Sequence, residues 1–480
     1  MDLRAFISLL ERAGELSRVR CSVDPYLEMA EIADRASKAH GPALLFESPV
    51  RPAGAVGPAM PVLMNQLGSY RRLELALGRP LDDIAGRIAE LVELQVPSGL
   101  IGKVKALGQL RELASFTPVV GKKASWREVG VEPPDLARLP VLTTWPGDGG
   151  PFITLPVVVT KDAKGRRNAG MYRLQVYDST STGMHWHMHH DGACNYREAG
   201  GRLEVAVALG TDPAVTYAAT APLPPGIDEF MFAGFLRGAP IELARCETVD
   251  LEVPADAEIV LEGYVERDER RREGPFGDHT GYYSLADEYP VFHLTAMSHR
   301  KDAIYPATIV GRPPMEDAYL GKATERLFLP LLRLVQPEIR DMDLPIEGVF
   351  HDCAIISIRK SYPGHAHKVM NAVWGMGQMM FTKFVVVVDE HVDVHDYSEV
   401  AWRVFNNVDP SRDCVVTRGP LDVLDHSGSS PRFGAKMGID ATRTWAEEGY
   451  ARDWPDEIAM DPEVKAQVSR RWAEYGLPFR

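Results

Sequence analysis

The sequence has few of the features that assign a protein to a class at first sight. Its five cysteines (Cys21, Cys194, Cys246, Cys353 and Cys414) are scattered and form no CxxC pair. We therefore expect reduced thiols, as in a cytoplasmic protein, and neither a disulfide framework nor a cysteine zinc site. Basic residues are in deficit, because 53 Lys and Arg against 67 Asp and Glu give a net charge of −14. This balance argues against nucleic acid or an anionic membrane surface as the main partner.

Several sequence signatures are also absent. No apolar run approaches the roughly 18 residues of a membrane span. The N-terminal stretch carries acidic residues and no small-residue cleavage site, which predicts a helix and not a signal peptide. There is no Walker A sequence, no GxGxxG after a strand, no HExxH and no GxSxG. The ATP-binding, dinucleotide-binding and serine-hydrolase classes lose support accordingly.

What is present is a chain long enough for about three domains, with the 45% hydrophobic content of an ordinary globular protein. Helical periodicity and a buried strand at Ala43–Glu47 mark the first part. Short strands rich in β-branched and aromatic residues mark the middle, which predicts a barrel or sandwich. The last part alternates strands and helices. The pattern predicts a mixed α+β fold with domains at 1–118, 119–315 and 316–480.

Local patterns predict particular elements. Asp2 can cap a first helix that ends at Gly14, and Asp228–Arg237 reads as a helix inserted among the strands. In the last part, His365–Gly375 reads as a helix between two apolar runs, CAIISI and FVVVV, that read as strands. That order predicts a parallel pair of strands joined by a crossover helix. The final 40 or so residues are expected to form a helical arm.

The stretch from Asn168 to Asn195 is dense in groups that can bind ligands. In GMHWHMHH, which reads as a strand, His185, His187 and His189 alternate with apolar residues, so they would share one face. The outer two would lie about 13 Å apart on a straight strand, so a metal could take one of them together with oxygen ligands from elsewhere. A polar strand face that lines a wet cavity is the alternative.

Two other polar residues stand out near apolar segments. Arg173, on a strand beside the histidines, could bind an anionic ligand with two parallel hydrogen bonds. A structural salt bridge is the alternative for this arginine. Glu229 opens an apolar helical stretch, where it is either a first-turn acid that interacts favourably with the helix dipole or a metal ligand.

Glu273 and Asp278 are separated by Gly-Pro-Phe-Gly, a linker that turns the chain. Both carboxylates can then face one site. Two acids close together raise the pKa of one of them, which produces a proton donor at neutral pH. The alternative is an ordinary acidic loop, because ERDERRRE just upstream is a solvated charge run.

Together these segments resemble the UbiD family of decarboxylases, which use prenylated FMN. The similarity covers nearly the whole chain and includes NAGMYRLQV, GMHWHMHHDG, DEFMFAGFLRG, EGPFGDHTGYY, TKFVVVVDE and GAKMGIDAT. TYAATAPLPPGIDEFMFAGFL and FHDCAIISIRKSYPGHAHKVMNAVWG look most like the members of quinone biosynthesis, including the menaquinone branch. The resemblance implies a central split β-barrel domain that binds the flavin. An N-terminal α/β domain and a C-terminal α/β oligomerisation domain would flank it.

The resemblance also implies a catalytic trio, Arg173, Glu273 and Asp278. Members vary between Asp and Glu at the last of these positions, and this chain has Asp. Arg173 would orient the substrate carboxylate and share a network with Glu273. Asp278 would donate the proton that replaces the carboxylate, with apolar walls raising its pKa.

A cofactor site and a metal site follow from the same comparison of motifs. Asn168, His189 and Glu229 match the ligands of a divalent ion, typically manganese, that is held against the cofactor phosphate and accompanied by a potassium ion. This chain has His190-Asp191-Gly192 where many members have a basic residue followed by Gly-Gly. The residues that match cofactor contacts are Met171, Tyr172, Arg173, His185, Trp186, His187, His190, Asp191 and Lys436.

The implied function is the reversible, non-oxidative decarboxylation of an aromatic acid in ubiquinone or menaquinone biosynthesis. A xenobiotic or phenolic aromatic acid is the alternative substrate. The implied partners are a small aromatic acid, a flavin prenyltransferase that supplies the cofactor, and further copies of the chain in a homodimer or homohexamer. One rival is a metal-dependent hydrolase that uses the histidine cluster and binds no flavin. The other is a flavin-binding protein that is indifferent to loss of Glu273 or Asp278.

Overall fold

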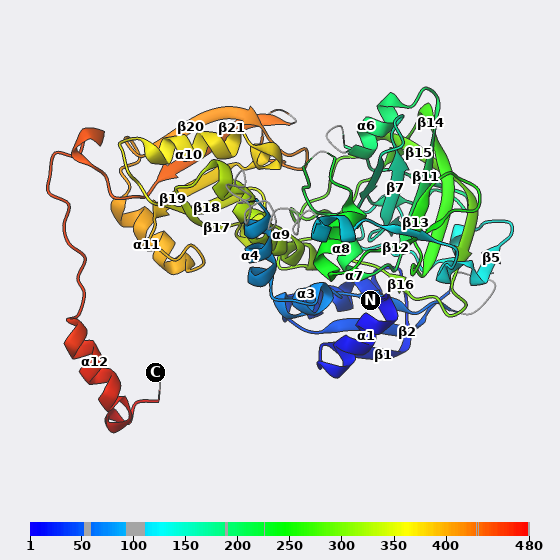
Figure 1. Ribbon diagram of the computed structural model, residues 1–480, viewed down its shortest axis with the longest axis horizontal. Coiled ribbons are helices and arrows are strands. Elements are labelled where there is room, and N and C mark those ends of the chain that lie inside the picture. The colour runs from blue at the N-terminus through cyan, green and yellow to red at the C-terminus, as the bar shows by residue number, and fades with distance from the viewer. Residues whose placement is uncertain are drawn as a thin grey trace.

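The computed structural model shows a chain of mixed α and β elements in three parts (Figure 1). The N-terminal part lies beside the central sheet, and the long helix α9 (Glu316–Val335) leads from the central part to the C-terminal part. Within the described chain no helix is both long and apolar enough to cross a membrane. The structure describes residues 1–51, 59–92, 111–187, 191–224, 226–428, 430 and 432–478.

The N-terminal part is a four-stranded sheet flanked by helices. Its first helix begins as predicted, because the Asp2 carboxylate accepts a hydrogen bond from the Ala5 N–H at 2.8 Å. The sheet order is β1-β2-β3-β16, so the strand at its end comes from far along the chain. The elements are α1 (Leu3–Arg12), β1 (Leu16–Val23), α2 (Glu28–Lys38), β2 (Ala43–Pro49), β3 (Val62–Met64), α3 (Tyr70–Leu77), α4 (Leu81–Val92) and β16 (Tyr305–Pro306).

One large sheet dominates the central part, in the order β10-β15-β14-β11-β7-β8, with β5 paired to β15. Its two outermost strands do not pair with each other among the described residues. The mixed α+β class is thus confirmed, whereas the split-barrel detail is not. The strands are β5 (Val129–Val131), β7 (Val157–Lys161), β8 (Arg167–Gly170), β10 (Ser181–Gly183), β11 (Arg202–Leu209), β14 (Ile259–Glu273) and β15 (Asp287–His299).

Around β11 both faces of this sheet are buried. On β11, Ala206 and Ala208 belong to one hydrophobic cluster, whereas Val205 and Val207 belong to another. Because successive side chains of a strand point to opposite faces, the two clusters pack on the two sides of the sheet. Shorter elements surround it: β4 (Val119–Gly121), η1 (Ser125–Glu128), η2 (Leu136–Arg138), β6 (Phe152–Ile153), β9 (Leu174–Gln175), α6 (Asp191–Glu198), α7 (Pro213–Ala218), α8 (Glu229–Arg237), β12 (Glu242–Arg245) and β13 (Glu252–Pro254).

The hairpin of β14 and β15 contributes most to positioning the site. These antiparallel strands pair over most of their length, with register shifts after Glu262 and after Val265. A Cβ added to Gly263 would lie 1.9 Å from the carbonyl oxygen of His293, so the close approach at this bulge requires glycine. Glu273 is the last residue of β14, and the loop that follows carries Asp278. The hairpin therefore presents both predicted catalytic acids at one end.

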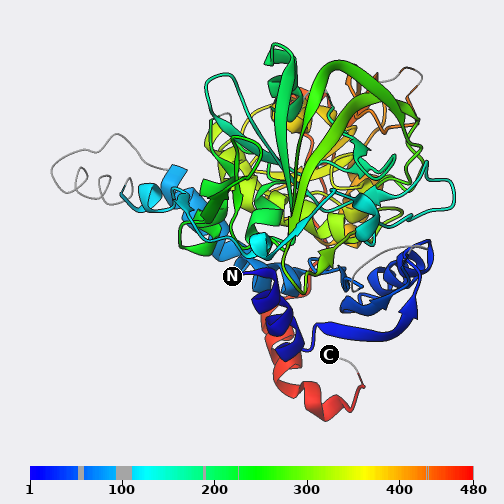
Figure 2. The same cartoon turned by 90° about the vertical axis from the view of Figure 1, so that its right-hand side faces the viewer.

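The C-terminal part has a five-stranded sheet in the order β17-β18-β19-β21-β20. β18 and β19 pair in parallel and are joined through α10, as predicted. Beyond residue 449 the chain extends away from the body as an arm (Figures 1 and 2), whose described residues include the helices α12 and η6. The elements are β17 (Ile339–Asp343), η3 (Ile346–Gly348), β18 (Cys353–Ile358), α10 (His365–Trp374), η4 (Gly377–Phe381), β19 (Phe384–Asp389), α11 (Tyr397–Asn407), β20 (Cys414–Pro420), β21 (Phe433–Asp440), η5 (Ala446–Glu448), α12 (Pro462–Arg471) and η6 (Trp472–Tyr475).

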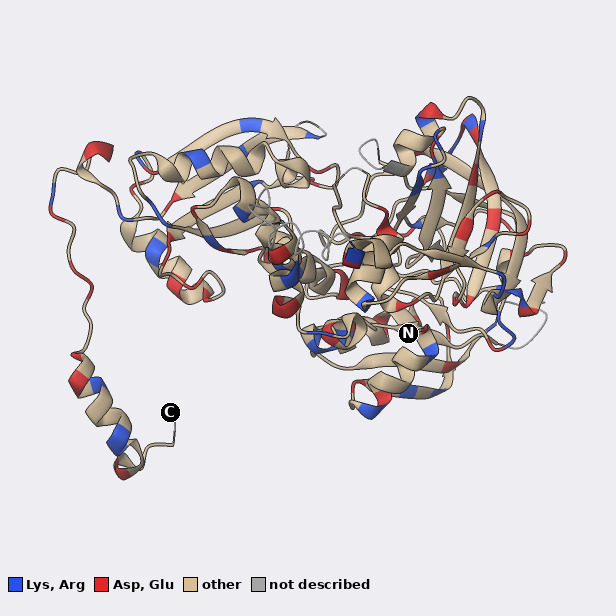
Figure 3. Ribbon diagram, in the orientation of Figure 1, with Lys and Arg blue, Asp and Glu red and all other residues tan. Residues whose placement is uncertain are grey.

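Charged residues of both signs are interspersed along all three parts (Figure 3). Along the described ribbon no part is predominantly basic. That nucleic acid is not a partner of this protein stays a prediction.

Candidate active site

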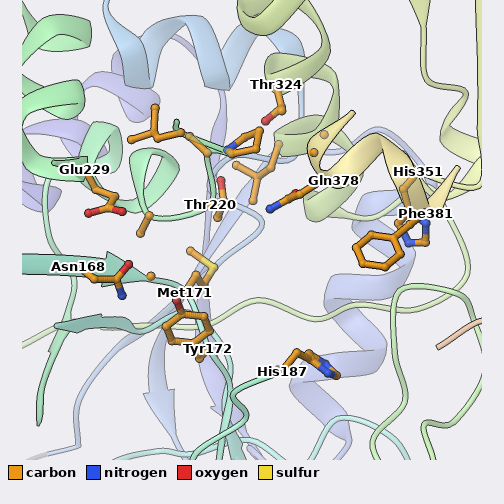
Figure 4. A pocket seen from close by; sticks show the side chains of 18 of the residues that line it. Asn168, Met171, Tyr172, His187, Thr220, Glu229, Thr324, His351, Gln378 and Phe381 are labelled. Carbon is orange, nitrogen blue, oxygen red and sulfur yellow. The ribbon is translucent and has the colours of Figure 1, made fainter. Parts of the chain in front are cut away.

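A cavity of about 1620 Å³ opens between the central part and the C-terminal part. Its walls come from β8 and the residues that follow it, from α9, from η4 and from the loop after β20. Figure 4 shows residues of the central part on one side and Gln378, Phe381 and His351 of the C-terminal part on another. The predicted site residues that line the cavity are Asn168, Met171, Tyr172, Arg173, His185, His187, Glu229 and Asp278.

Arg173 lies between the two predicted catalytic acids. Its Nε donates to Oε1 of Glu273 at 3.1 Å, and its Nη1 donates to Oδ2 of Asp278. Nη2 is 3.4 Å from the Ser284 hydroxyl, and the guanidinium carbon is 4.4 Å from the centre of the Phe276 ring. The structure thus brings the predicted trio together and fixes the cation with two carboxylates and a ring.

The charge state of the two acids differs from the sequence prediction. Burial would raise the pKa of Glu273, but His185 and Arg173 outweigh it and hold that pKa below its usual value. Burial would likewise raise the pKa of Asp278, but Arg173 and His279 hold it well below its usual value. Each acid faces a cation or a hydrogen-bond donor and not the other carboxylate. The predicted rise in the pKa of Asp278 is therefore wrong for the protein without substrate.

A loop with a defined turn places Asp278. Gly274 follows β14 with a φ of 91°, a backbone conformation that glycine adopts readily. Its N–H donates to Oε1 of Gln175 at 2.7 Å, and Nε2 of Gln175 donates to the carbonyl of Gly149 at 2.7 Å. These bonds tie the loop that carries Asp278 to β9, which begins one residue after Arg173.

His185 and His187 face each other, with 2.8 Å between their Nε2 atoms. Nδ1 of His185 lies 2.6 Å from Oε1 of Glu273, and the His185 ring stacks on Tyr289 at 4.3 Å between centroids. Burial and Arg173 lower the pKa of His185, so the neutral ring donates its Nδ1–H to Glu273. β10 ends at Gly183 and residues 184–187 form no strand, so the predicted strand is wrong there.

His279 was not among the residues predicted for the site. Its backbone N–H and its Nδ1 lie 2.8 and 3.0 Å from Oδ1 of Asp278. Burial would lower the pKa of His279, but Asp278, Asp317 and Asp422 raise it to about 9. This residue lies inside the motif EGPFGDHTGYY, so its place beside Asp278 in the sequence was the one signal for it.

Of the three predicted metal ligands, the structure describes Asn168 and Glu229. Asn168 is buried on β8, and its Nδ2 has no hydrogen-bond partner among the described residues. Glu229 begins α8, where Asp228 caps the helix, and its Oε2 accepts the Ala169 N–H at 3.0 Å. Both line the same side of the cavity (Figure 4). His189 lies outside the described residues, so the set of three stays a prediction.

The other predicted cofactor contacts fall in different places. Met171, Tyr172 and His187 line the cavity. Trp186 is buried with its ring edge-on to Tyr172 at 6.4 Å between centroids. His190 lies outside the described residues, and Asp191 is described only as the first residue of α6.

Lys436, the predicted phosphate contact, lies on β21 in the C-terminal part. Its ammonium group donates to the carbonyl oxygens of Met380 and Thr382, and burial lowers its pKa to about 8. Met380 and Thr382 line the cavity. The lysine therefore supports one wall of the cavity, and a direct contact with phosphate stays a prediction.

Comparison with known proteins identifies the family. The N-terminal, Rift-related and C-terminal domains of 3-octaprenyl-4-hydroxybenzoate carboxy-lyase match residues 7–92, 118–313 and 318–441. An uncharacterized protein of Archaeoglobus fulgidus is 54% identical over 480 residues, which cover 98% of each chain. The chain belongs to the UbiD family of carboxy-lyases.

Solved structures of this family have the same fold. Vanillic acid decarboxylase of Sedimentibacter hydroxybenzoicus, in its closed form, is 28% identical with a TM-score of 0.84, and 98% of each chain is covered. The UbiD-class enzyme HmfF of Pelotomaculum thermopropionicum, in complex with FMN, is 31% identical with a TM-score of 0.80, covering 98% of this chain and 100% of that one. An evolved dimeric form of HmfF in complex with prenylated FMN is 31% identical with a TM-score of 0.77, covering 97% of this chain and 98% of that one.

Proposed function

We propose that the protein decarboxylates an aromatic carboxylic acid with prenylated FMN as its cofactor. The observation that carries this proposal is the arrangement of Arg173 between Glu273 and Asp278 at the wall of a large cavity. In this arrangement Arg173 is a fixed cation that can bind a substrate carboxylate, and Asp278 is an acid that can donate a proton. The family membership and the flavin-bound relatives support the same conclusion.

Loss of CO2 from an unsaturated carbon leaves an electron pair that no amino-acid side chain can accommodate. When bound, prenylated FMN supplies the electron sink for that pair. Arg173 lines the cavity and can bind the substrate carboxylate. Glu273 holds the arginine through Oε1, the oxygen to which His185 also donates. Asp278 then donates a proton to the carbon that has lost the carboxylate.

The residues present suit a flavin phosphate held through a divalent ion. Asn168 places a buried amide on the cavity wall, with Nδ2 unpartnered among the described residues, and Glu229 adds a carboxylate beside it. Amide and carboxylate oxygens with one imidazole suit a hard divalent cation. We propose Asn168, His189 and Glu229 as ligands of manganese or another divalent ion, with potassium nearby. Tyr172 and His187 would contact the cofactor from the same wall.

The substrate is an aromatic acid, and its ring substituents are the finer part of the proposal. A quinone precursor is the first candidate, because the sequence resembles the quinone-biosynthesis members most. A phenolic acid is the second candidate, since a structural relative acts on vanillic acid. A flavin prenyltransferase is the proposed supplier of the cofactor.

The test is to produce the protein together with a flavin prenyltransferase and to supply a panel of prenylated and simple hydroxylated aromatic acids. We expect a modified flavin by mass spectrometry and release of CO2 from one class of acid. Bound metal without flavin would favour the hydrolase. Bound flavin with no decarboxylation of any acid would favour a flavin-binding protein and contradict the proposal.

A further inference from the structure

One contact across the cavity belongs to no role assigned so far. Nε2 of His279, in the catalytic loop, lies 2.8 Å from Nε2 of His351, in the C-terminal part. His351 follows η3 and lies in a short loop just before β18. Both side chains are mostly buried, with 16% and 20% exposed, and both line the cavity.

The loop that carries His351 is held in an unusual conformation. Val349 and Phe350 have φ values of 46° and 54°, in the left-handed region that β-branched and bulky residues rarely occupy. The Phe350 ring stacks on His279 at 5.1 Å between centroids. Phe350 also packs on Gly321 of α9, where an added Cβ would lie 2.5 Å from the Cβ of Phe350. Strained backbone persists where its surroundings determine it, and such positions cluster at functional sites.

The short Nε2–Nε2 distance and the charge of His279 together set the direction of donation. Only one hydrogen can occupy the space between the two Nε2 atoms, so one ring donates and the other accepts. With its pKa raised to about 9, His279 is an imidazolium at neutral pH. It therefore donates Nδ1–H to Asp278 and Nε2–H to His351. His351 accepts through Nε2, whereas its Nδ1, 3.2 Å from Oδ1 of Asp352, has no hydrogen-bond partner among the described residues.

We propose that His279 stores the proton that Asp278 delivers, and that His351 is the positioning residue that aims this proton at Asp278. The inference rests on the proposed function. It assigns a role to the C-terminal part in proton delivery, because the acceptor for Nε2–H comes from that part.

The step moves one proton and no other atom. The N–H bond at Nδ1 of His279 breaks as an O–H bond forms at Oδ1 of Asp278, and the imidazolium becomes a neutral ring that keeps its Nε2–H. A substrate carboxylate at Arg173 weakens the hold of that cation on Asp278, which favours the transfer. After product release, water that reaches the site returns a proton to Nδ1 of His279. The charged groups around His279 are Asp278 in its own loop, Asp317 on α9 and Asp422 after β20.

The experiment compares His351→Leu with His351→Gln in the cofactor-loaded enzyme. Leucine cannot accept the Nε2–H, whereas the glutamine side-chain oxygen can. We expect His351→Leu to lower kcat about tenfold, the size of one lost hydrogen bond, with KM unchanged. The alkaline limb of the kcat profile should move to lower pH, since the imidazolium loses an acceptor. His351→Gln should restore most of the wild-type kcat and most of the wild-type pH profile. His391→Leu, an exposed histidine of the same part, is the matched control and should behave as wild type.

Two results would overturn the proposal. One is a His351→Leu enzyme with unchanged kcat and pH profile. The other is a His351→Gln enzyme as impaired as the leucine variant, which would indicate a structural role only. Titration of the His279 ring by NMR of protein labelled with 15N-histidine provides a readout without turnover. A lower His279 pKa in His351→Leu supports the contact even if no acid is decarboxylated, so failure of the proposed function remains distinguishable.

Discussion

At the scale of the residue, Asp278 must change its protonation state to do the proposed chemistry. Asp278 pairs with Arg173 through Oδ2 and with His279 through Oδ1, and both neighbours favour the carboxylate form. A substrate that brings its own carboxylate to Arg173 supplies a competing anion. Under the proposed function, that anion would raise the pKa of Asp278 and so favour its protonation when substrate is bound.

Replacing Asp278 with Asn preserves the shape but removes the acidic proton. We expect turnover to fall on the order of 10²-fold or more, as is typical for a general acid. Cofactor content should stay near wild type, because the proposed phosphate and metal contacts lie elsewhere. Exchange of the product ring hydrogen in deuterated water should fall in parallel. Asp287→Asn, an exposed acid at the start of β15, is the control. Full activity of Asp278→Asn would make Glu273 the next residue to test as the acid.

The sequence predicted single residues well where a long motif carries them. Arg173, Glu273 and Asp278 were expected to meet, and they do. The protonation of Asp278 was not predicted correctly, because it depends on which groups surround the acid and not on the motif. His351 was not found at all, since it meets His279 only through folding, 72 residues further along the chain.

At the scale of the element, most predicted helices and strands occur, including the crossover between β18 and β19. The strand that the alternating histidines predicted after Gly183 does not form at residues 184–187. The reason lies in the neighbouring strand, β15. β10 pairs with β15 in the register Gly183 to Val291, so the next pair would involve Pro290. Proline has no N–H, so it cannot donate to the growing ladder. The Met184 N–H still donates to the Pro290 carbonyl at 2.9 Å, but no bond returns, so the ladder ends at this pair and His185 turns toward Glu273.

The N-terminus of α8 supports a second test, because it places Glu229 beside Asn168 on the cavity wall. We expect Glu229→Ala to lower manganese and flavin content together by about tenfold or more, the range seen when metal-site groups are removed. Elemental analysis and the flavin absorbance measure the two contents. Glu242→Ala, an exposed glutamate on β12, should retain both. If metal and flavin are unchanged in Glu229→Ala, this residue is not a ligand.

At the scale of the whole molecule, the arm beyond residue 449 reaches away from the body (Figure 1). An ion pair between Arg403 and Glu457 attaches its start to α11. Next to that pair the arm exposes Ile458 fully and 60% of Met460. Burial of these two apolar side chains against a partner would be favourable. We propose that the chain forms a homo-oligomer in which a second copy covers them.

Introducing charge at these positions tests the proposal. The double variant Ile458→Asp and Met460→Asp should reduce the particle mass to that of a smaller assembly, since a carboxylate is costly to bury in an apolar contact. Light scattering coupled to size exclusion measures the mass. Gln467→Asp, an exposed position on α12, adds charge to the same arm and should leave the mass unchanged. An unchanged mass in the double variant, or a monomeric wild type, would contradict the proposal.

The N-terminal sheet has a consequence for how the chain is made. Its strand β16 comes from Tyr305–Pro306, and it pairs with β3 at Val62 and Leu63. During synthesis the ribosome must therefore release more than 300 residues before this sheet can be completed. Pairing over such a sequence distance is slow, because the loop must close before the contacts form. Until β16 has been synthesised, β3 has no partner strand on one side. Because an unpaired strand edge promotes aggregation, the N-terminal part of the nascent chain is exposed to it during synthesis.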